Sequence, residues 1–358
     1  MQSDITGRRI VRRALLWGGC LSTCLSTCLL APFDAVRAQD RLLPVTVELG
    51  DVSLTKLPFV MAAEAGIYQR NGLEVRQYIT PNAAELIRKS AGLVVPKDFV
   101  GIGAGDINIG GGSPTLVRMT SDARAPQRIV LATTDDVSRF HIISRPDIAG
   151  PQDLKGKRIG FSVEGALSHY VTILFARRMG WDYNRDLSLF ANGAGADVIK
   201  SGRVDAFTAD EIASAEALRQ GLKDLVDTGA YRFPMPGSGV NAEKSWLSKN
   251  HEAAARFVKS TVEAVALLKN DKPAAFAAMA KWYGITEPAR QEEVYAQAAQ
   301  LPGRPYPSVE GIRKMMEIYD YREMRLHRAE DFYDASFVAE LDRSGYIDGL
   351  YQGGAAAR

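Results

Sequence analysis

Residues 45–66 read VTVELGDVSLTKLPFVMAAEAG and contain one complete strand, loop and helix. The first five residues alternate apolar and polar side chains, which is typical of a half-buried β-strand, and Gly50 ends it. Pro58 predicts the first turn of a helix, and Gly66 predicts its end, because proline suits the start of a helix and glycine the residue after its end. A strand followed by a helix is the building unit of α/β folds.

The same alternation of apolar strands and helical segments continues along the chain in two series, separated near Pro151. Asn82 with Glu85 predicts a capping box for one of the helices. Residues 233–239 are rich in proline and glycine and predict a connector, and the chain beyond Asn250 is mostly helical. We expect strands at 73–79, 107–109, 128–133, 158–161, 187–190, 204–208 and 222–226, and helices at 83–89, from 113 onward and at 165–179.

Residues 1–38 have the pattern of an export signal. Four arginines precede an apolar run at 14–30, and small residues stand at Val36 and Ala38, where a signal peptidase would cut. An uncleaved membrane anchor is the alternative. Cys24 and Cys28 each follow a threonine, a poor residue before an acylated cysteine, so we do not expect a lipoprotein. The general secretory and twin-arginine routes both stay open.

Removing this segment leaves 320 residues without cysteine. A disulfide, a thiol nucleophile and a thiolate metal site are therefore excluded from the exported part. The remaining 39 Lys and Arg face 40 Asp and Glu, a formal charge of −1. Nucleic acid and anionic membranes are not expected as main partners of a chain with so balanced a charge.

Four motifs, in order along the chain, resemble periplasmic substrate-binding proteins of ABC importers. Residues 56–75 are similar to that family's N-terminal Pro–hydrophobic–x–Ala pattern with its later Gly-Leu-Glu-Val, and 153–160 to its Asp-Leu-Lys-Gly-Lys run. Residues 202–206 resemble its Gly-x-Val-Asp-Ala strand entry, and 332–337 its C-terminal ending. The similar subgroup serves sulfonates, nitrate, taurine and thiamine-type pyrimidines.

The resemblance implies an α/β, two-lobed periplasmic binding protein fold (type II) with two hinge crossings and a helical C-terminal part. It implies a periplasmic monomer that captures a small organic ligand (sulfonate, taurine-like zwitterion, or pyrimidine or amine compound) and delivers it to a membrane permease, with no catalysis, cofactor or metal. Lobe 1 is expected at 42–135 plus 238–325, lobe 2 at 138–232, and a tail packing on lobe 1 at 326–358.

In open α/β sheets, ligands bind beyond the carboxyl ends of the strands, where helix N-termini offer free N–H groups. Three strand-to-helix junctions fit, at 51–59, 110–115 and 162–169. The predicted ligand-binding residues are Asp51, Ser53, Thr55, Lys56, Phe59, Gly112, Ser113, Thr133, Glu164, Gly165, Ser168, Asn192, Asp210 and Glu211.

Several of these positions allow two interpretations. The glycines at 110–112 could cradle a charged group or form only a tight turn. Ala166 and Leu167 stand where the similar family has hydroxyls, which weakens the case for a sulfonate or nitrate. His169 is expected to be structural. Acids near the cleft are numerous, and unless they are solvated helix caps they favour an amine, amidine or ammonium ligand.

Two other functions remain alternatives. The first is an enzyme on the same scaffold, of the pyrimidine-synthase type that the family resembles. It would need a cysteine-rich metal motif and a His–Lys arrangement, and residues 39–358 contain no cysteine. The second is a soluble receptor that hands its ligand to a sensor kinase. The sequence leaves the identity and charge of the ligand open.

Overall fold

The computed structural model describes residues 41–122 and 124–352, without the side chains of 111–115. The predicted signal peptide, 1–38, and the end of the predicted tail, 353–358, lie outside the described residues. No helix among the described residues combines the length and apolar character needed to cross a membrane.

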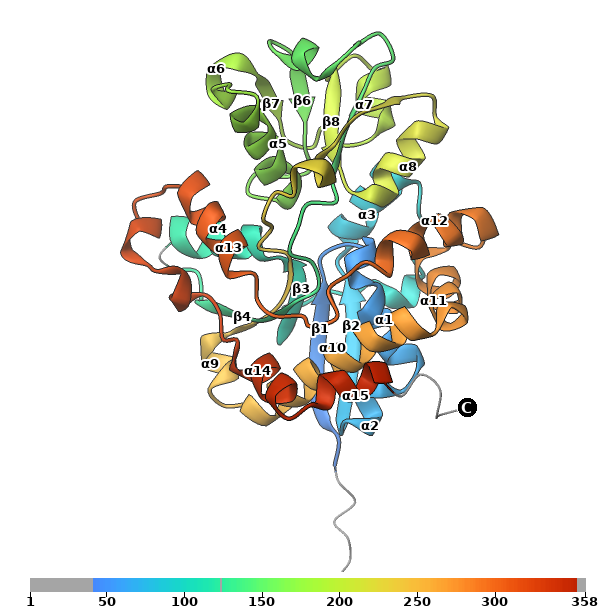
Figure 1. Ribbon diagram of the computed structural model, residues 1–358, viewed down its shortest axis with the longest axis vertical. Helices are drawn as coiled ribbons and strands as arrows, with labels where there is room; N and C mark the ends of the chain where they lie inside the picture. The colour runs from blue at the N-terminus through green and yellow to red at the C-terminus, as the bar shows by residue number, and fades with distance from the viewer. Residues whose placement is uncertain (1–40, 123, 353–358) are drawn as a thin grey trace, which may run out of the picture. The chain divides into compact units, whose positions relative to one another are not determined.

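The first of two five-stranded sheets lies in lobe 1 (Figure 1). Its order is β2 (Leu73–Ile79), β1 (Leu43–Leu49), β3 (Ile107–Gly111), β10 (Ser238–Glu243) and β4 (Arg128–Thr133). Strand β10 runs antiparallel to both of its neighbours. Strand β10 follows all the strands of the second sheet in the sequence. Lobe 1 is therefore built from two separate stretches of chain.

The second sheet lies in lobe 2. Its order is β7 (Ser188–Phe190), β6 (Arg158–Gly160), β8 (Ala206–Ala209), β5 (His141–Ser144) and β9 (Lys223–Asp227). Here β5 is the antiparallel strand. Each lobe therefore has a mainly parallel core sheet with one antiparallel strand, the strand through which the chain enters or re-enters the lobe.

Helices cover these sheets. In lobe 2 they are α5 (Leu167–Arg178), α6 (Tyr183–Asp186), α7 (Ala196–Lys200) and α8 (Glu211–Arg219). The helices before lobe 2 are α1 (Leu57–Glu64), α2 (Ile67–Arg70), α3 (Pro81–Ala91) and α4 (Gly112–Ser121). Those after it are α9 (Lys244–Leu247), α10 (His251–Asn270), α11 (Lys272–Ala278), α12 (Pro288–Ala298), α13 (Val309–Ile318), α14 (Ser336–Arg343) and α15 (Tyr346–Gln352).

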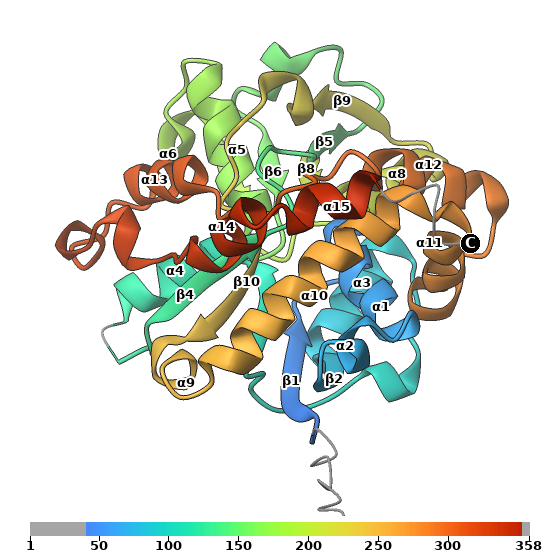
Figure 2. The same cartoon turned by 60° about the horizontal axis from the view of Figure 1, so that its bottom comes forward.

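The long helix α10 lies on the side of lobe 1 that faces away from lobe 2 and packs on α1, α2 and β2 (Figure 2). Phe257, Val258 and Leu268 follow a helical spacing on one face and are fully buried. Phe257 stacks on Phe59 of α1, with ring centroids 6.3 Å apart. Apolar burial at about 25 cal/mol per Å² makes this face a main source of lobe 1 stability.

Two chain segments cross between the lobes, 134–140 and 232–237. They run antiparallel and are bonded to each other: the Ser138 amide donates to the Phe233 carbonyl and the Met235 amide to the Asp136 carbonyl, both at 2.9 Å. Gly237, with φ of +75°, leaves no room for a side chain, since a Cβ there would lie 2.1 Å from the Asp135 carbonyl oxygen.

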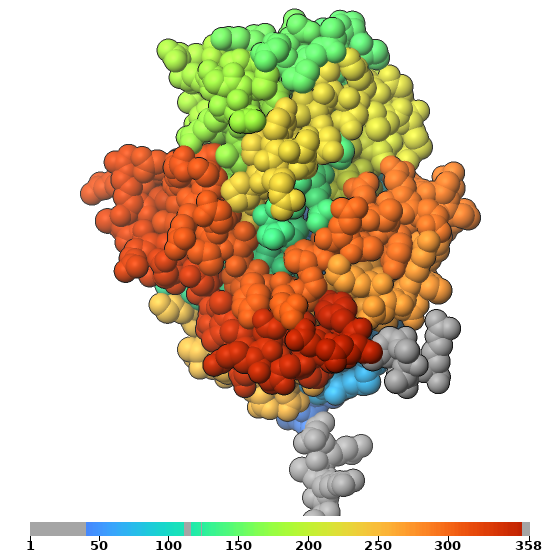
Figure 3. Space-filling view, viewed as in Figure 1, coloured from blue at the N-terminus to red at the C-terminus, as the bar shows by residue number. Residues whose placement is uncertain are grey.

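The C-terminal part lies against lobe 1. Residues 332–334 add to the outer edge of β4, where the Val130 amide donates to the Phe332 carbonyl at 2.8 Å. Helix α13 contacts both α4 and α5, so this part also touches lobe 2. In Figure 3, residues of this region, coloured orange and red, cover much of the lower lobe on the face shown.

The expected α/β fold with two lobes and two crossings is confirmed. The residue boundaries proposed for the lobes and the tail stay a prediction. The predicted capping box of Asn82 and Glu85 is wrong: α3 begins at Pro81, and the Thr80 side chain accepts from the Ala83 amide at 3.3 Å. Pro81 suits the first helical position, so the helix starts one residue after Thr80.

Candidate functional site

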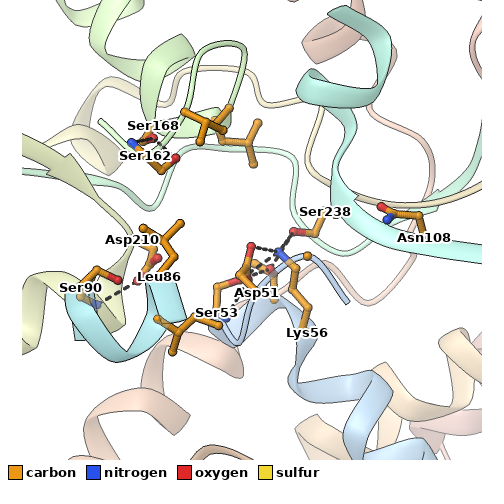
Figure 4. A pocket seen from close by; sticks show the side chains of 18 of the residues that line it. Asp51, Ser53, Lys56, Leu86, Ser90, Asn108, Ser162, Ser168, Asp210 and Ser238 are labelled. Atoms are coloured by element: carbon orange, nitrogen blue, oxygen red, sulfur yellow. Dashed lines mark hydrogen bonds and ion pairs between the residues drawn. The ribbon is translucent and has the colours of Figure 1, made fainter. Parts of the chain in front are cut away.

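A cavity of about 610 Å³ lies where the lobes meet, and residues of both lobes line it (Figure 4). The loop after β1 supplies one wall, the crossings a second, and the starts of α5 and α8 a third. This volume is within the usual range for small-molecule sites and far larger than a single small anion needs.

Lys56 is the centre of the lobe 1 wall. Its side chain is 2% exposed, and Nζ donates to Asp51 Oδ2 at 2.9 Å, to Ser53 Oγ at 3.1 Å and to Ser238 Oγ at 2.7 Å. The Thr55 hydroxyl lies 2.8 Å from Ser238 Oγ and joins the same network. The ammonium group therefore has three protein partners and is not available as an anion-binding group.

Asp51 is held as a carboxylate by this network. Desolvation by the surrounding protein would raise the pKa of Asp51, but the charge of Lys56 and the hydrogen bonds from Lys56 and Ser53 outweigh it and lower the pKa below its ordinary value. The Asp51 side chain is still 40% exposed. Asp51 thus presents negative charge to the cavity while compensating Lys56.

Two further cavity residues lie where the crossings meet the lobe 1 sheet, Asp135 and Ser238. Asp135 is one of the acids expected near the cleft, although it is not among the predicted ligand-binding residues, and sequence reasoning missed Ser238. The Ser238 amide donates to Asp135 Oδ1 at 2.5 Å, and the Ser238 side chain bonds Lys56. Burial raises the pKa of Asp135. Arg139 of the first crossing also lines the cavity, and its Nη2 donates to the Gln300 carbonyl at 3.2 Å.

Two predicted acids lie at the start of α8 in lobe 2. Asp210 caps the helix, and its Oδ1 accepts from the amides of Ile212 at 3.0 Å and Ala213 at 2.9 Å. Glu211 Oε1 accepts from the Leu54 amide of lobe 1 at 3.0 Å. Among the described residues, the second oxygen of each carboxyl group has no hydrogen-bond partner.

Burial and the neighbouring acids change the protonation of this pair. Burial raises the pKa of Asp210, and the nearby Asp51 adds to the effect. For Glu211, burial and the charge of Asp210 raise the pKa from 4.5 to about 8. An added positive charge beside these groups would stabilise both carboxylates.

The start of α5 forms the lobe 2 wall opposite Lys56 in Figure 4. Ser168 Oγ accepts from the Ser162 amide at 3.1 Å and lies 2.8 Å from the Ser162 hydroxyl. No side chain caps α5, whose N-cap residue is Ala166. These two hydroxyls and the helix start can accommodate an acceptor group of a ligand.

Seven predicted site residues line the cavity: Asp51, Ser53, Thr55, Lys56, Ser168, Asp210 and Glu211. Their assignment as ligand contacts stays a proposal. Gly112 and Ser113 lie in the first turn of α4, but their side chains are outside the described part.

Five predicted residues do not line the cavity. Phe59 is fully buried in the core beneath α1, because it lies on the face that packs on α10. Thr133 is buried at the end of β4. Glu164 and Asn192 are exposed on loops whose neighbouring residues, Val163 and Ala194, line the cavity in their place. Gly165, with φ of +75°, shapes the turn before α5, and its amide donates to His169 Nδ1 at 3.1 Å.

His169 is structural, as the sequence suggests. It stacks on Phe161 with centroids 4.3 Å apart, and its Nδ1 lies 3.0 Å from the Tyr319 hydroxyl. Burial lowers its pKa to about 4, so the ring is neutral at physiological pH.

Further cavity residues had no local signal in the sequence. They come from strand interiors and helix faces far apart along the chain: Glu48, Leu86, Ser90, Asn108, Arg118, Arg128, Thr208 and Glu243. Among the described residues, no group of three or more His, Cys, Asp and Glu has the arrangement of a metal site.

Solved structures similar to this chain include periplasmic binding proteins and an enzyme. The periplasmic aliphatic sulphonate binding protein SsuA from Escherichia coli has a TM-score of 0.59 and 18% identity, covering 79% of this chain and 93% of that chain. The periplasmic nitrate-binding protein NrtA from Synechocystis PCC 6803 has a TM-score of 0.65 and 14% identity, covering 85% and 89%.

The desulfurization enzyme DSZB has a TM-score of 0.56 and 17% identity, covering 84% of this chain and 99% of that chain. The same fold therefore supports catalysis in at least one protein. Among curated proteins, none matches the chain with significance.

Residues 55–275, more than half of the chain, match the protein family described as NMT1/THI5 like. The resemblance seen in the sequence motifs is thus confirmed for family and fold. The chain belongs to the NMT1/THI5-like family and has the two-lobed fold of periplasmic binding proteins.

Proposed function

We propose that this protein is the solute-binding component of an ABC importer: exported to the periplasm as a monomer, it captures a small organic molecule between its lobes and delivers it to a permease. The family membership and the cavity at the meeting point of the lobes support this. A ligand that touches both lobes shifts the equilibrium towards closure, since it binds the closed state better than the open one.

We further propose that the ligand carries an amine, amidine or ammonium group. One observation carries this. The Lys56 ammonium group already donates three hydrogen bonds to the protein, so it has none left for an anionic ligand. Asp210 and Glu211, in contrast, each keep a carboxyl oxygen without a partner among the described residues. A cation would satisfy these oxygens and lower the desolvation penalty that raises the pKa of Glu211.

An enzyme on this scaffold is less well supported by the site. Among the described residues that line the cavity there is no histidine and one lysine, Lys56, whose ammonium group is fully engaged. Ser53, Ser162, Ser168 and Ser238 lie beside other hydroxyls or Lys56, and no serine among the described cavity residues is hydrogen-bonded to a histidine base.

Thermal-shift screening of residues 39–358 against sulfonates, carboxylates, pyrimidines and amines tests the proposal. Amines or amidines should raise the melting temperature most, because a ligand at about 1,000 times its Kd adds roughly 4 kcal/mol to the free energy of unfolding. Stabilisation by sulfonates alone would contradict the proposed charge of the ligand. In cells, deleting the gene should then abolish import of the compound that the screen identifies.

A further inference from the structure

The cavity does not end at the meeting point of the lobes: it extends along one face of the lobe 1 sheet. That face is polar, because Glu48 of β1 pairs in register with Asn108 of β3, which pairs with Asn241 of β10. The alternate residues, such as Val47 and Ile109, are fully buried on the other face, where α1 and α10 pack.

A glycine-rich loop, Gly101–Gly105, lies over part of this polar face. Gly103, Ala104 and Gly105 line the cavity. A Cβ on Gly105 would lie 2.8 Å from the Glu48 amide nitrogen, so the loop backbone approaches the strand directly. We call this extension the sheet arm and define it by Glu48, Gly103–Gly105, Asn108, Arg118, Arg128 and Glu243.

The sheet arm lies apart from the acids of α8. Figure 4 places Asn108 on the far side of Lys56 and Ser238 from Asp210. Gly50 and Gly110 line the cavity between the two regions, and a Cβ on Gly50 would lie 3.3 Å from Gly110 Cα. A ligand that fills both regions must therefore be elongated.

The charges of the sheet arm balance. Arg128 is 7% exposed, and its guanidinium is held by Asn241 Oδ1 at 2.7 Å and by Glu243 at 3.5 Å. Arg118 and Glu48 add one further charge of each sign. Because the charges balance and Arg128 is already paired with Glu243, the arm favours neither an anionic nor a cationic group. An apolar group would remove these charges from water without replacing their hydrogen bonds.

The hydrogen-bonding groups of the arm include both donors and acceptors. The Glu48 carboxylate can only accept, the Arg118 guanidinium can only donate, and the Asn108 amide can do both. None of these three side chains has a hydrogen-bond partner among the described residues. The Tyr78 hydroxyl, buried and without a partner there, lies beside Gly103, since a Cβ on Gly103 would lie 3.7 Å from it.

We infer that the sheet arm binds an uncharged, polyhydroxylated tail of an elongated ligand whose cationic head lies at Asp210 and Glu211. Hydroxyl groups both donate and accept, so they satisfy Glu48, Asn108 and Arg118 together, and the glycine-lined wall leaves room for them. The inference rests on the proposed function, which supplies the position and charge of the head.

Three primary amines of similar length but different tails test this: 1-amino-1-deoxy-D-glucitol with a polyol tail, hexylamine with an apolar tail and 6-aminohexanoate with an anionic tail. Calorimetry on residues 39–358 should show the polyol amine binding roughly tenfold or more tighter than the other two. Glu48→Gln with Asn108→Ala should remove most of that advantage and leave the affinity for hexylamine unchanged.

Arg76→Gln, on the same sheet face but outside the cavity, is the matched control and should leave all three affinities unchanged. Circular dichroism shows whether each variant is folded. Equal affinity for the three amines, or a double variant that keeps the polyol preference, overturns the inference and leaves the proposed function intact. No affinity for any of the three also overturns the inference, whereas the thermal-shift screen against sulfonates, carboxylates, pyrimidines and amines decides the proposed function separately.

Discussion

The Glu211 carboxyl group of lobe 2 accepts a hydrogen bond from the Leu54 amide of lobe 1, with 3.0 Å between Oε1 and N. It is a side chain that crosses directly from one lobe to the other, and it does so while 6% exposed. Helices α3 and α8 pack against each other beside it. The lobes therefore touch beside the cavity, an arrangement that we call closed, and Glu211 is part of that contact.

The closed arrangement should depend on pH through Glu211. The pKa of Glu211 is about 8 here, against 4.5 for an ordinary glutamate. Between pH 4.5 and 8 the closed form therefore holds one more proton than a form in which Glu211 is exposed to water. The stabilisation of the closed form is therefore complete below about pH 4.5 and is lost as pH rises through 8. Distances between spin labels on the two lobes, measured without ligand from pH 5 to 8.5, should show more open molecules at the high end.

Glu211→Gln is the control for this pH dependence. Glutamine keeps an acceptor for Leu54 but cannot ionise, so the distance distribution should change much less with pH. Asp135, Asp210, His141 and Tyr283 also lie near Glu211, with Asp51 and Lys56 beside Asp210, and the titration of Asp210 and His141 sets the dependence that remains. A variant with the full pH dependence would contradict the role of Glu211.

Replacing Asp210 by Asn and Glu211 by Gln together should reveal the ligand's charge. A cationic ligand should bind more weakly by roughly 1–3 kcal/mol, the worth of a charge-assisted hydrogen bond. An anionic ligand should bind as well or better. Asparagine remains a good helix cap, so α8 should stay intact.

Calorimetry on this double variant gives the affinity, and Glu216→Gln, on the same helix but outside the cavity, is the matched control. If the Asp210→Asn, Glu211→Gln double variant binds an identified ligand as tightly as the unchanged protein, the two acids are only surface groups of the cavity.

Replacing Lys56 by Met should destabilise lobe 1. Removing the ammonium group leaves Asp51 and two hydroxyls without their common donor, and we expect a loss of about 2 kcal/mol, below the usual cost for a fully buried pair because Asp51 is 40% exposed. Urea unfolding measures it. Lys259→Met, which breaks a long pair with Glu263 at 3.8 Å in which the lysine is 39% exposed, should cost less than about 0.5 kcal/mol.

Replacing Phe59 by Ala should cost stability and spare binding. The fully buried ring stacks on Phe257, and such truncations cost about 3–5 kcal/mol. The affinity for a ligand should stay the same at temperatures where the variant is folded, because Phe59 does not line the cavity. A large loss of affinity in the folded variant would contradict this and indicate that Phe59 contributes to ligand binding.

The strands were predictable because their signal is local. Strand β2, predicted at 73–79, has those bounds in the structure, since the apolar pattern and the flanking Gly72 and Pro81 act within a few residues. The start of α3 was predicted wrongly because two nearby residues, Thr80 and Asn82, are both good N-caps. Pro81 decides between them, since proline suits the first position of a helix that Thr80 caps.

The site was only partly predictable. Loop residues after β1 and before α8 could be placed at the cavity, because the ends of strands and helices determine where they lie. Ser238 could not, since its partner is distant in sequence: 182 positions separate Ser238 from Lys56. Asn192, with φ of +55°, follows a strand end as predicted, but its backbone turns it outward into solvent.

The bonded pair of crossings has a consequence for the speed and form of lobe movement. Two independent linkers would allow the lobes to twist, slide and tilt separately. Here the bridge between Val137 and Pro234, with its flanking hydrogen bonds, makes the linkers a short two-stranded ribbon. Such a ribbon bends easily only across its plane, so the lobes move about essentially one axis, and each encounter with a ligand ends in the same closed geometry without a search through alternatives.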